Sequence, residues 1–153
     1  MPTQDIGIDF IAYDQTGHPV LLAEAKSRRG TSAQWAAQLR RNMLAHGILP
    51  RAKYFLIATP DRMYLWAGDG AEPAEAPPKF TIDAAKEFQP YFEKFNQEPS
   101  GIGPQAFDFL VLTWLNDLAW SGEQMLKQDV SLRWLADSGL IESLHQARIE
   151  MNP

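Results

Sequence analysis

The sequence of 153 residues contains no cysteine. This absence excludes disulfide bonds, zinc–thiolate centres and catalysis by a thiol nucleophile, and it is compatible with a reducing cytoplasm. No uninterrupted apolar run approaches the length of about 18 residues that a membrane-spanning helix needs. The N-terminal segment has no basic start followed by an apolar stretch, so no signal peptide is expected. The sequence therefore predicts a soluble, cytoplasmic protein without a membrane partner.

Positive charge is also scarce, because 14 lysine and arginine residues face 19 aspartate and glutamate residues, for a formal net charge of -5. A protein that coats nucleic acid without specificity needs a broadly basic surface, so this class is excluded. A local basic patch remains compatible with the composition. The sequence offers two such clusters, "KSRRG" at residues 26–30 and the pair Arg40 and Arg41. A serine hydrolase has no support, since no G-x-S-x-G motif occurs.

What the sequence does contain is the composition of an ordinary globular domain, with 45% hydrophobic and 22% charged residues. Apolar and β-branched runs predict strands, and a helix follows a capping residue, Thr31 or Ser32, and ends near Gly47. The five expected elements, in the order strand, strand, helix, strand, strand, occupy residues 6–13, 20–25, 33–46, 53–58 and 63–67. On the helix, an apolar side chain at every fourth position predicts the face that packs on the sheet. These side chains are Trp35, Leu39 and Met43.

Beyond residue 70 the character of the sequence changes. Residues 71–82 are rich in proline, alanine and acidic side chains and predict a loop or linker. Residues 83–153 predict a helical part, with helices over 83–96, 104–120 and 122–138 and a short last one. We expect one domain of the α/β class. Its core, residues 1–70, would hold a small mixed sheet of about four strands flanked by helices, and the helical part would pack on that core.

The stretch "VLLAEAKS" places Glu24 and Lys26 at the end of an apolar strand. Side chains alternate along a strand, so these two groups share one face. The turn segment "DQTGHP" has its centre equally far from Asp9 and Glu24, so an antiparallel hairpin sets these two acids opposite each other. Opposed residues in such a pair have Cβ atoms roughly 4.5–5.5 Å apart. The sequence predicts that two carboxylates and one ammonium group converge on the sheet.

Two carboxylates this close repel each other unless a cation lies between them. Mg²⁺, or Mn²⁺ in its place, suits carboxylate oxygens and keeps several waters, so Asp9 and Glu24 are candidate metal ligands. Such an ion lowers the pKa of a bound water, and Lys26 would position that water or offset negative charge in the transition state. The alternative is an ordinary ion pair between Glu24 and Lys26 on a solvated strand face, which contributes little.

These residues carry a resemblance to a known family. The segment "IDFIAYDQTGHPVLLAEAKS" resembles the signature of the PD-(D/E)xK nuclease superfamily, whose members share the restriction-endonuclease-like fold. By this resemblance Asp9 is the first acid of the motif, Glu24 the second acid and Lys26 its lysine. The resemblance also implies a polar residue on the following helix, for which Gln38 is a candidate together with Gln34 one turn earlier.

The resemblance implies a fold and an activity as well. The family's core usually begins with a helix that often contributes a further acid, but only five residues precede the first strand here. A C-terminal helix or a partner would therefore have to take its place. The implied activity is metal-dependent hydrolysis of phosphodiesters in nucleic acid. DNA is favoured over RNA as the substrate, and the sequence leaves both open. The residues expected to contact phosphates are Arg28, Arg29, Arg40 and Arg41.

A second function, of a different class, is left open by the apolar segment "FDFLVLTWLNDLAW". It predicts a helix that is apolar nearly all round and hence buried on several sides. That helix would belong either to the core or to an interface with a protein partner or a second copy of the chain. The alternative function is thus a catalytically inactive nuclease-like module that binds a partner, or forms a homodimer, through the tryptophan-rich helices of residues 104–138.

Overall fold

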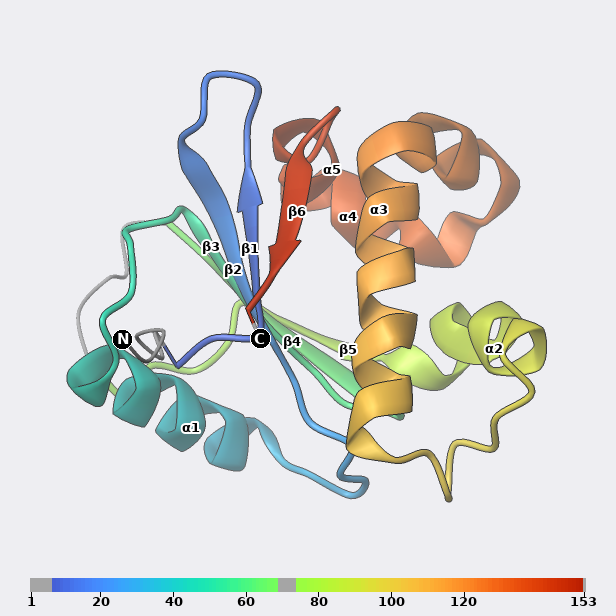
Figure 1. Cartoon of the computed structure of the whole chain (residues 1–153), viewed down its shortest axis with the longest axis horizontal. Helices are drawn as coiled ribbons and strands as arrows, with labels where there is room; N and C mark the ends of the chain where they lie inside the picture. The colour runs from blue at the N-terminus through green and yellow to red at the C-terminus, as the bar shows by residue number, and fades with distance from the viewer. Residues whose placement is uncertain (1–6, 69–73, 153) are drawn as a thin grey trace, which may run out of the picture.

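The structure, a computed structural model, describes residues 7–68 and 74–152. It is a mixed α/β fold in which helices cover both faces of one sheet (Figure 1). In chain order the elements are β1 (Phe10–Tyr13), β2 (Pro19–Ala25), α1 (Ala33–His46), β3 (Tyr54–Ala58), β4 (Arg62–Ala67), β5 (Phe80–Asp83), α2 (Ala84–Lys94), α3 (Pro104–Gln128), the 3₁₀ turn η1 (Val130–Leu132), α4 (Arg133–Asp137), α5 (Leu140–Ser143) and β6 (Arg148–Met151).

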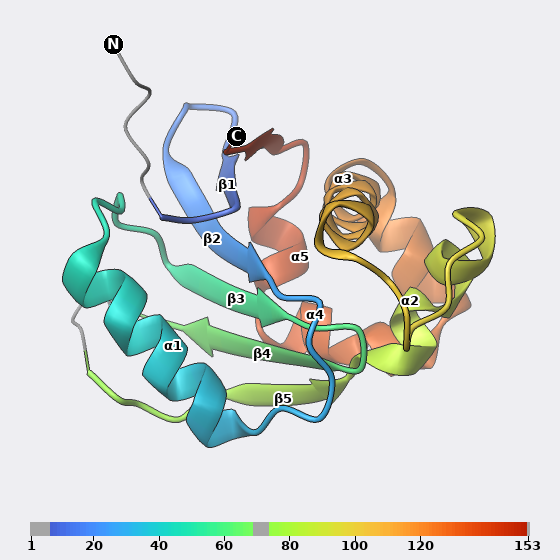
Figure 2. The same cartoon turned by 60° about the horizontal axis from the view of Figure 1, so that its bottom comes forward.

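The sheet has six strands in the order β5-β4-β3-β2-β1-β6. Only β2 and β3 run parallel, and every other neighbouring pair is antiparallel. A parallel pair requires a crossover connection, and α1 provides it. Figure 2 shows the sheet between α1 on one side and the remaining helices on the other. The carboxyl end of β2 thus lies in the middle of the sheet, directly before the crossover.

The expected number of about four strands was wrong. The four expected strands correspond to β1–β4, although β1 begins at Phe10, and residue 6 of the predicted strand lies outside the described residues. The two additional strands are β5, which lies partly in the predicted linker, and β6, which follows the short helix α5. Each has four residues and forms one edge of the sheet. Short, half-exposed edge strands carry too little periodic apolar character to be distinguished from loops.

The helix α1 begins and ends where the sequence predicts. The hydroxyl of Ser32 accepts a hydrogen bond from the backbone N–H of Trp35 at 3.1 Å, which caps the first turn. At the other end the N–H of Gly47 donates to the carbonyl of Met43. The three members of the predicted apolar stripe pack, partly buried, against the core on this side of the sheet. The most deeply buried apolar positions of the helix are Ala36 and Ala37 beside them. Small side chains let the helix approach the sheet closely.

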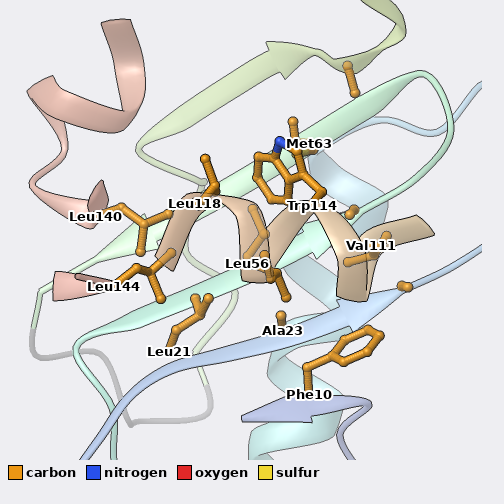
Figure 3. Packing of buried hydrophobic residues seen from close by; sticks show 14 of the residues in the cluster. Phe10, Leu21, Ala23, Leu56, Met63, Val111, Trp114, Leu118, Leu140 and Leu144 are labelled. Carbon is orange, nitrogen blue, oxygen red and sulfur yellow. The ribbon is translucent and has the colours of Figure 1, made fainter. Parts of the chain in front are cut away.

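The opposite face of the sheet carries the larger core. In Figure 3, Trp114 and Leu118 of α3 lie over Leu56 and Ala23 of the sheet. The cluster joins residues from β1 to Ala147, so the predicted core and the predicted helical part share one hydrophobic interior. The helix α3 joins the helix predicted at 104–120 to the first part of the one predicted at 122–138, with a kink at Ser121 where the break was expected. The remainder of the second predicted helix is divided between η1 and α4. No helix in the part of the chain that the structure describes is long and apolar enough to cross a membrane.

Candidate active site

The acids Asp9 and Glu24 meet where β1 and β2 separate. The hairpin register pairs Phe10 with Ala23, so the next position sets Asp9 opposite Glu24, as the centre of the turn predicts. The backbone N–H of Asp9 donates to Oε1 of Glu24 at 3.0 Å, and the N–H of Ala25 donates to Oδ2 of Asp9 at 2.8 Å. Each carboxylate therefore caps the backbone of the other strand, which fixes both side chains at this end of the hairpin.

The ammonium group of Lys26 completes this arrangement. Its Nζ lies 3.2 Å from Oε2 of Glu24, whose side chain is only 8% exposed, whereas the lysine is 44% exposed. A useful comparison is the ion pair of Arg148 and Glu150 on β6, which also joins residues two apart on a strand, with both side chains more than half exposed. The pair on β6 is an ordinary solvated ion pair. Glu24 differs because its carboxylate is buried and lies beside a second acid.

Burial and charge both alter the acidity of Glu24. Its pKa is raised to about 7, first because the carboxyl group is buried and second because the negative charge of Asp9 lies beside it, while the ammonium of Lys26 opposes the shift. The carboxyl group of Glu24 therefore keeps its proton to a higher pH than an ordinary glutamate does. Acids with strongly shifted pKa values are typical of functional sites, where a carboxylate is kept for its chemistry although its burial costs stability.

A third acid of this site, Asp108, comes from the first turns of α3. Its pKa is raised to about 6, first by partial burial and second by the charge of Asp9, while Lys26 acts in the opposite direction. Figures 1 and 2 both place the segment that follows β2 beside the N-terminal end of α3, which contacts β2. The sequence analysis did not identify Asp108. The one feature of the sequence that marks Asp108 is its position as the single acid in the apolar run "FDFLVLTW".

The basic segment after Lys26 is held at both ends. The N–H of Lys26 donates to the carbonyl of Ala58 at 2.9 Å, and the N–H of Gly30 donates to Oδ2 of Asp61 at 3.2 Å. Between these anchors Arg28 and Arg29 are exposed. The guanidinium of Arg28 lies 5.6 Å from the centroid of the Trp35 ring at the start of α1. Two arginines are thus presented to solvent directly after the lysine of the site.

The expectation for Arg40 as a phosphate-contacting residue does not agree with its position. Arg40 is 3% exposed, and its guanidinium lies 5.4 Å from the ring of Trp66 and 5.7 Å from that of Phe55. Burial lowers its pKa. Its side chain extends along the apolar surface on the same helix face as Ala36 and Ala37, and the two rings favour the cation. Arg40 therefore holds α1 on the sheet.

Two further candidates lie on α1 and make contacts away from the acid pair. The amide of Gln38 is exposed and donates to Oε1 of Glu75 at 3.5 Å. Arg41, 43% exposed, forms an ion pair with Oε2 of the same Glu75 at 3.3 Å. Both side chains thus contact the segment that leads to β5, and the contacts found do not join them to Asp9, Glu24 or Lys26.

The chemistry of the acids suits a hard divalent ion. Carboxylate oxygens are the protein ligands that Mg²⁺ and Mn²⁺ prefer, and Mg²⁺ is commonly held by one or two carboxylates, with waters and substrate phosphates as the other ligands. Within residues 7–68 and 74–152, no group of three histidine or acidic side chains is arranged to ligate one ion. Asp9 and Glu24 fit a site of the two-carboxylate type. The negative charge of Asp9 helps to raise the pKa of Asp108, so this third acid lies near the pair.

Comparisons with known proteins give no further assignment, since no protein-family model, curated protein or solved structure matches this chain significantly.

Proposed function

We propose that this protein is a metal-dependent phosphodiesterase that cleaves nucleic acid, DNA in preference to RNA, with a site of the PD-(D/E)xK type. The observation that supports this proposal most strongly is the junction of the buried carboxylate of Glu24 with Asp9 and Lys26 at the end of a strand hairpin. An ion pair alone would not need a second acid, nor a carboxylate whose pKa lies near 7.

The proposal includes a restriction-endonuclease-like core made of β1–β4 and α1. A strand hairpin, a crossover helix and a parallel strand follow each other in the order that this core requires. Among the described residues, α3 covers the sheet face opposite α1 and carries Asp108 toward the acid pair, which is the position that the family's first helix would take. The C-terminal part would thus complete a core that the N-terminal part begins.

Each side chain has a distinct role in the proposed reaction. Asp9 and Glu24 would hold one Mg²⁺ or Mn²⁺, which supplies a water of lowered pKa and stabilises negative charge on the phosphate. The exposed ammonium of Lys26 would orient the attacking water and offset the charge that develops on the phosphoryl oxygens. Arg28 and Arg29 would contact neighbouring phosphates, because they follow Lys26 after one residue and both are exposed, with the guanidinium of Arg28 beside the Trp35 ring.

Cleavage assays with a matched pair of variants test this function. Lys26→Met removes the charge and keeps an unbranched side chain of similar bulk, and Arg148→Met removes the charge from the ion pair on β6. On DNA and RNA oligonucleotides with Mg²⁺ or Mn²⁺, we expect Lys26→Met to reduce cleavage roughly 100-fold or more. Arg148→Met should leave the rate unchanged. Both variants should fold, because the exposed pair on β6 contributes about 1 kcal/mol or less and the buried carboxyl group of Glu24 can stay protonated when Lys26 is replaced.

Retention of full cleavage by Lys26→Met would contradict the assignment of this site. The alternative function is a nuclease-like module that lacks activity and binds a protein partner or a second copy through α3. The observation that favours it is the exposure of Phe109 and Trp120, at 58% and 67%, since large exposed apolar side chains are typical of interfaces. Absence of cleavage, no stabilisation by divalent ions and a dimeric mass by light scattering would together favour this module.

A further inference from the structure

Asp61 joins two loops at the end of the sheet where the candidate active site lies. It occupies the turn between β3 and β4, while the basic segment, residues 26–30, leads from β2 to α1. Oδ2 of Asp61 accepts a hydrogen bond from the backbone N–H of Gly30 at 3.2 Å, and Oδ1 accepts one from the hydroxyl of Thr59 at 3.2 Å. Figure 2 shows the two loops side by side. One carboxylate oxygen therefore holds the basic segment, and the other is fixed to the turn.

The turn that carries Asp61 is itself held by the sheet. Thr59 is fully buried, and its hydroxyl accepts a hydrogen bond from the N–H of Arg62 at 3.0 Å. The proton of this hydroxyl lies within reach of the Arg62 carbonyl, at 3.1 Å, as well as of Asp61. The carbonyl of Asp61 accepts a hydrogen bond from the N–H of Ala84 at 3.1 Å, which joins the turn to the start of α2. A side chain supported in this way is set in place by its surroundings before any ligand binds.

The basic segment adopts a particular backbone conformation where it meets Asp61. Gly30 has φ +71°, in the left-handed region, and a Cβ at this position would meet open space, so the backbone conformation and not close packing favours glycine. The next residue, Thr31, hydrogen-bonds through its hydroxyl to the hydroxyl of Tyr64 at 2.7 Å, and Tyr64 on β4 is buried. The chain is therefore attached to the β3–β4 turn and to the sheet directly after the exposed arginines of the segment.

We propose that Asp61 is a positioning residue of the phosphodiesterase, which holds the basic segment so that Arg28 and Arg29 lie where nucleic-acid phosphates approach the metal site. This inference rests on the proposed function. The negative charge of Asp61 repels phosphates, so this acid would weaken binding if charge were its only effect. Its benefit is that the backbone of the segment is ordered beforehand and does not have to be ordered when nucleic acid binds. The hydrogen bond and the charge of Asp61 therefore act in opposite directions on affinity.

Two substitutions of Asp61 separate these effects in DNA binding, measured by the anisotropy of a labelled oligonucleotide with Ca²⁺, which carboxylates also bind, in place of Mg²⁺. Asp61→Asn keeps an oxygen acceptor for Gly30 and removes the charge, so it should bind at least as tightly as the wild type. Asp61→Ala removes both, and its affinity should fall about 2-fold to 10-fold, the range for one hydrogen bond. The slope of log Kd against log salt should become shallower, because fewer phosphates are contacted. In cleavage, KM should rise more than kcat falls, since the N–H of Lys26 keeps its own hydrogen bond to Ala58.

Limited proteolysis with trypsin measures the order of the basic segment without any nucleic acid. Trypsin cuts after Arg28 and Arg29, which are exposed, and a segment that opens more often is cut faster. We expect Asp61→Ala to be cut in this segment about 2-fold to 10-fold faster than the wild type, and Asp61→Asn at the wild-type rate. Asp83→Ala is the matched control, because it removes an acid beside the same turn whose carboxylate caps α2, and it should also be cut at the wild-type rate. Circular dichroism checks the folding, and Asp61→Ser, with its shorter side chain, repeats the comparison if Asp61→Ala does not fold.

Two outcomes would overturn this role of Asp61. One is equal tryptic cleavage of Asp61→Ala and the wild type, and the other is DNA binding by Asp61→Ala as tight as that of the wild type or tighter. A wild type that neither binds nor cleaves nucleic acid would instead refute the phosphodiesterase itself, and the proteolysis would still show whether Asp61 holds the segment. Failure of the inference and failure of the proposed function are thus distinguishable.

Discussion

Replacement of Glu24 by glutamine should stabilise the folded protein above neutral pH. The folded chain holds a proton on Glu24 up to a pKa of about 7, whereas the unfolded chain releases it near the ordinary value of 4.5. Between these values the folded state binds more protons, so the free energy of unfolding of the wild type falls as the pH rises. Glutamine cannot ionise, and the variant therefore avoids this loss.

The size of the effect follows from the displacement of the pKa. A carboxyl group whose pKa rises from 4.5 in the unfolded chain to about 7 in the folded chain lowers the free energy of unfolding by about 3 kcal/mol once it is fully ionised. The favourable effect of the Lys26 ammonium on the ionised carboxylate is already contained in this pKa, so the loss of the ion pair is not subtracted again. In the absence of divalent ions we expect a net stabilisation of about 3 kcal/mol at about pH 8. It should vanish well below pH 4.5, where the carboxyl group is protonated in both the folded and the unfolded state.

Urea unfolding followed by tryptophan fluorescence, in buffers from about pH 5 to about pH 8 with a chelator present, measures this difference. Glu150→Gln on β6 is the matched control, because it breaks an ion pair of the same spacing whose carboxylate is 54% exposed. Asp9→Asn provides an internal check: it removes the charge that raises the pKa of Glu24, so the pH-dependent loss should move to lower pH. A Glu24→Gln variant that is no more stable than the wild type at about pH 8 would refute the reasoning.

Two further predictions concern the turn between α4 and α5. Tyr54→Phe removes the hydrogen bond from its buried hydroxyl to the carbonyl of Ser138 at 2.8 Å and should lower the free energy of unfolding by about 1–2 kcal/mol in urea titrations. Gly139→Ala should cost about 1–3 kcal/mol, since Gly139 has φ +80° and an added Cβ would lie 2.8 Å from the Tyr54 hydroxyl. The double variant should lose less free energy of unfolding than the two single variants lose together, because Tyr54→Phe removes the hydroxyl oxygen that the Cβ added at position 139 would contact. Losses that add strictly would contradict this contact.

The hairpin part of the site could be predicted because its geometry is local. A short turn fixes the register of an antiparallel pair, so the centre of the turn is enough to set Asp9 opposite Glu24. Alternation along β2 then brings Lys26 to the same face. Asp108 could not be found in this way. It reaches the site only because α3 docks across the sheet, and no local pattern specifies where a distant helix will dock.

The helix α1 shows a different limit of sequence patterns. Periodicity indicates the apolar stripe of Trp35 and Leu39, which packs against the core on this side of the sheet but is only partly buried. Ala36, Ala37 and Arg40 are buried more deeply than this stripe. The rings of Phe55 and Trp66 lie beside the guanidinium of Arg40. An arginine carries a long apolar stem, so its charge alone does not place it at the surface.

The formal charge of -5 and a nucleic-acid substrate are compatible on physical grounds. Charges act over about 8–10 Å at physiological ionic strength, so the field at the site depends on nearby groups and not on the whole chain. Lys26, Arg28 and Arg29 provide the positive charge beside the acid pair, and Asp61 lies against the same segment. Three cations nevertheless neutralise only a few phosphates, which limits affinity and makes it sensitive to salt. The proposed enzyme would therefore gain affinity from a second copy or a partner that brings further phosphate contacts, and the exposed Trp120 and Phe109 on α3 are the surface through which such an assembly could form.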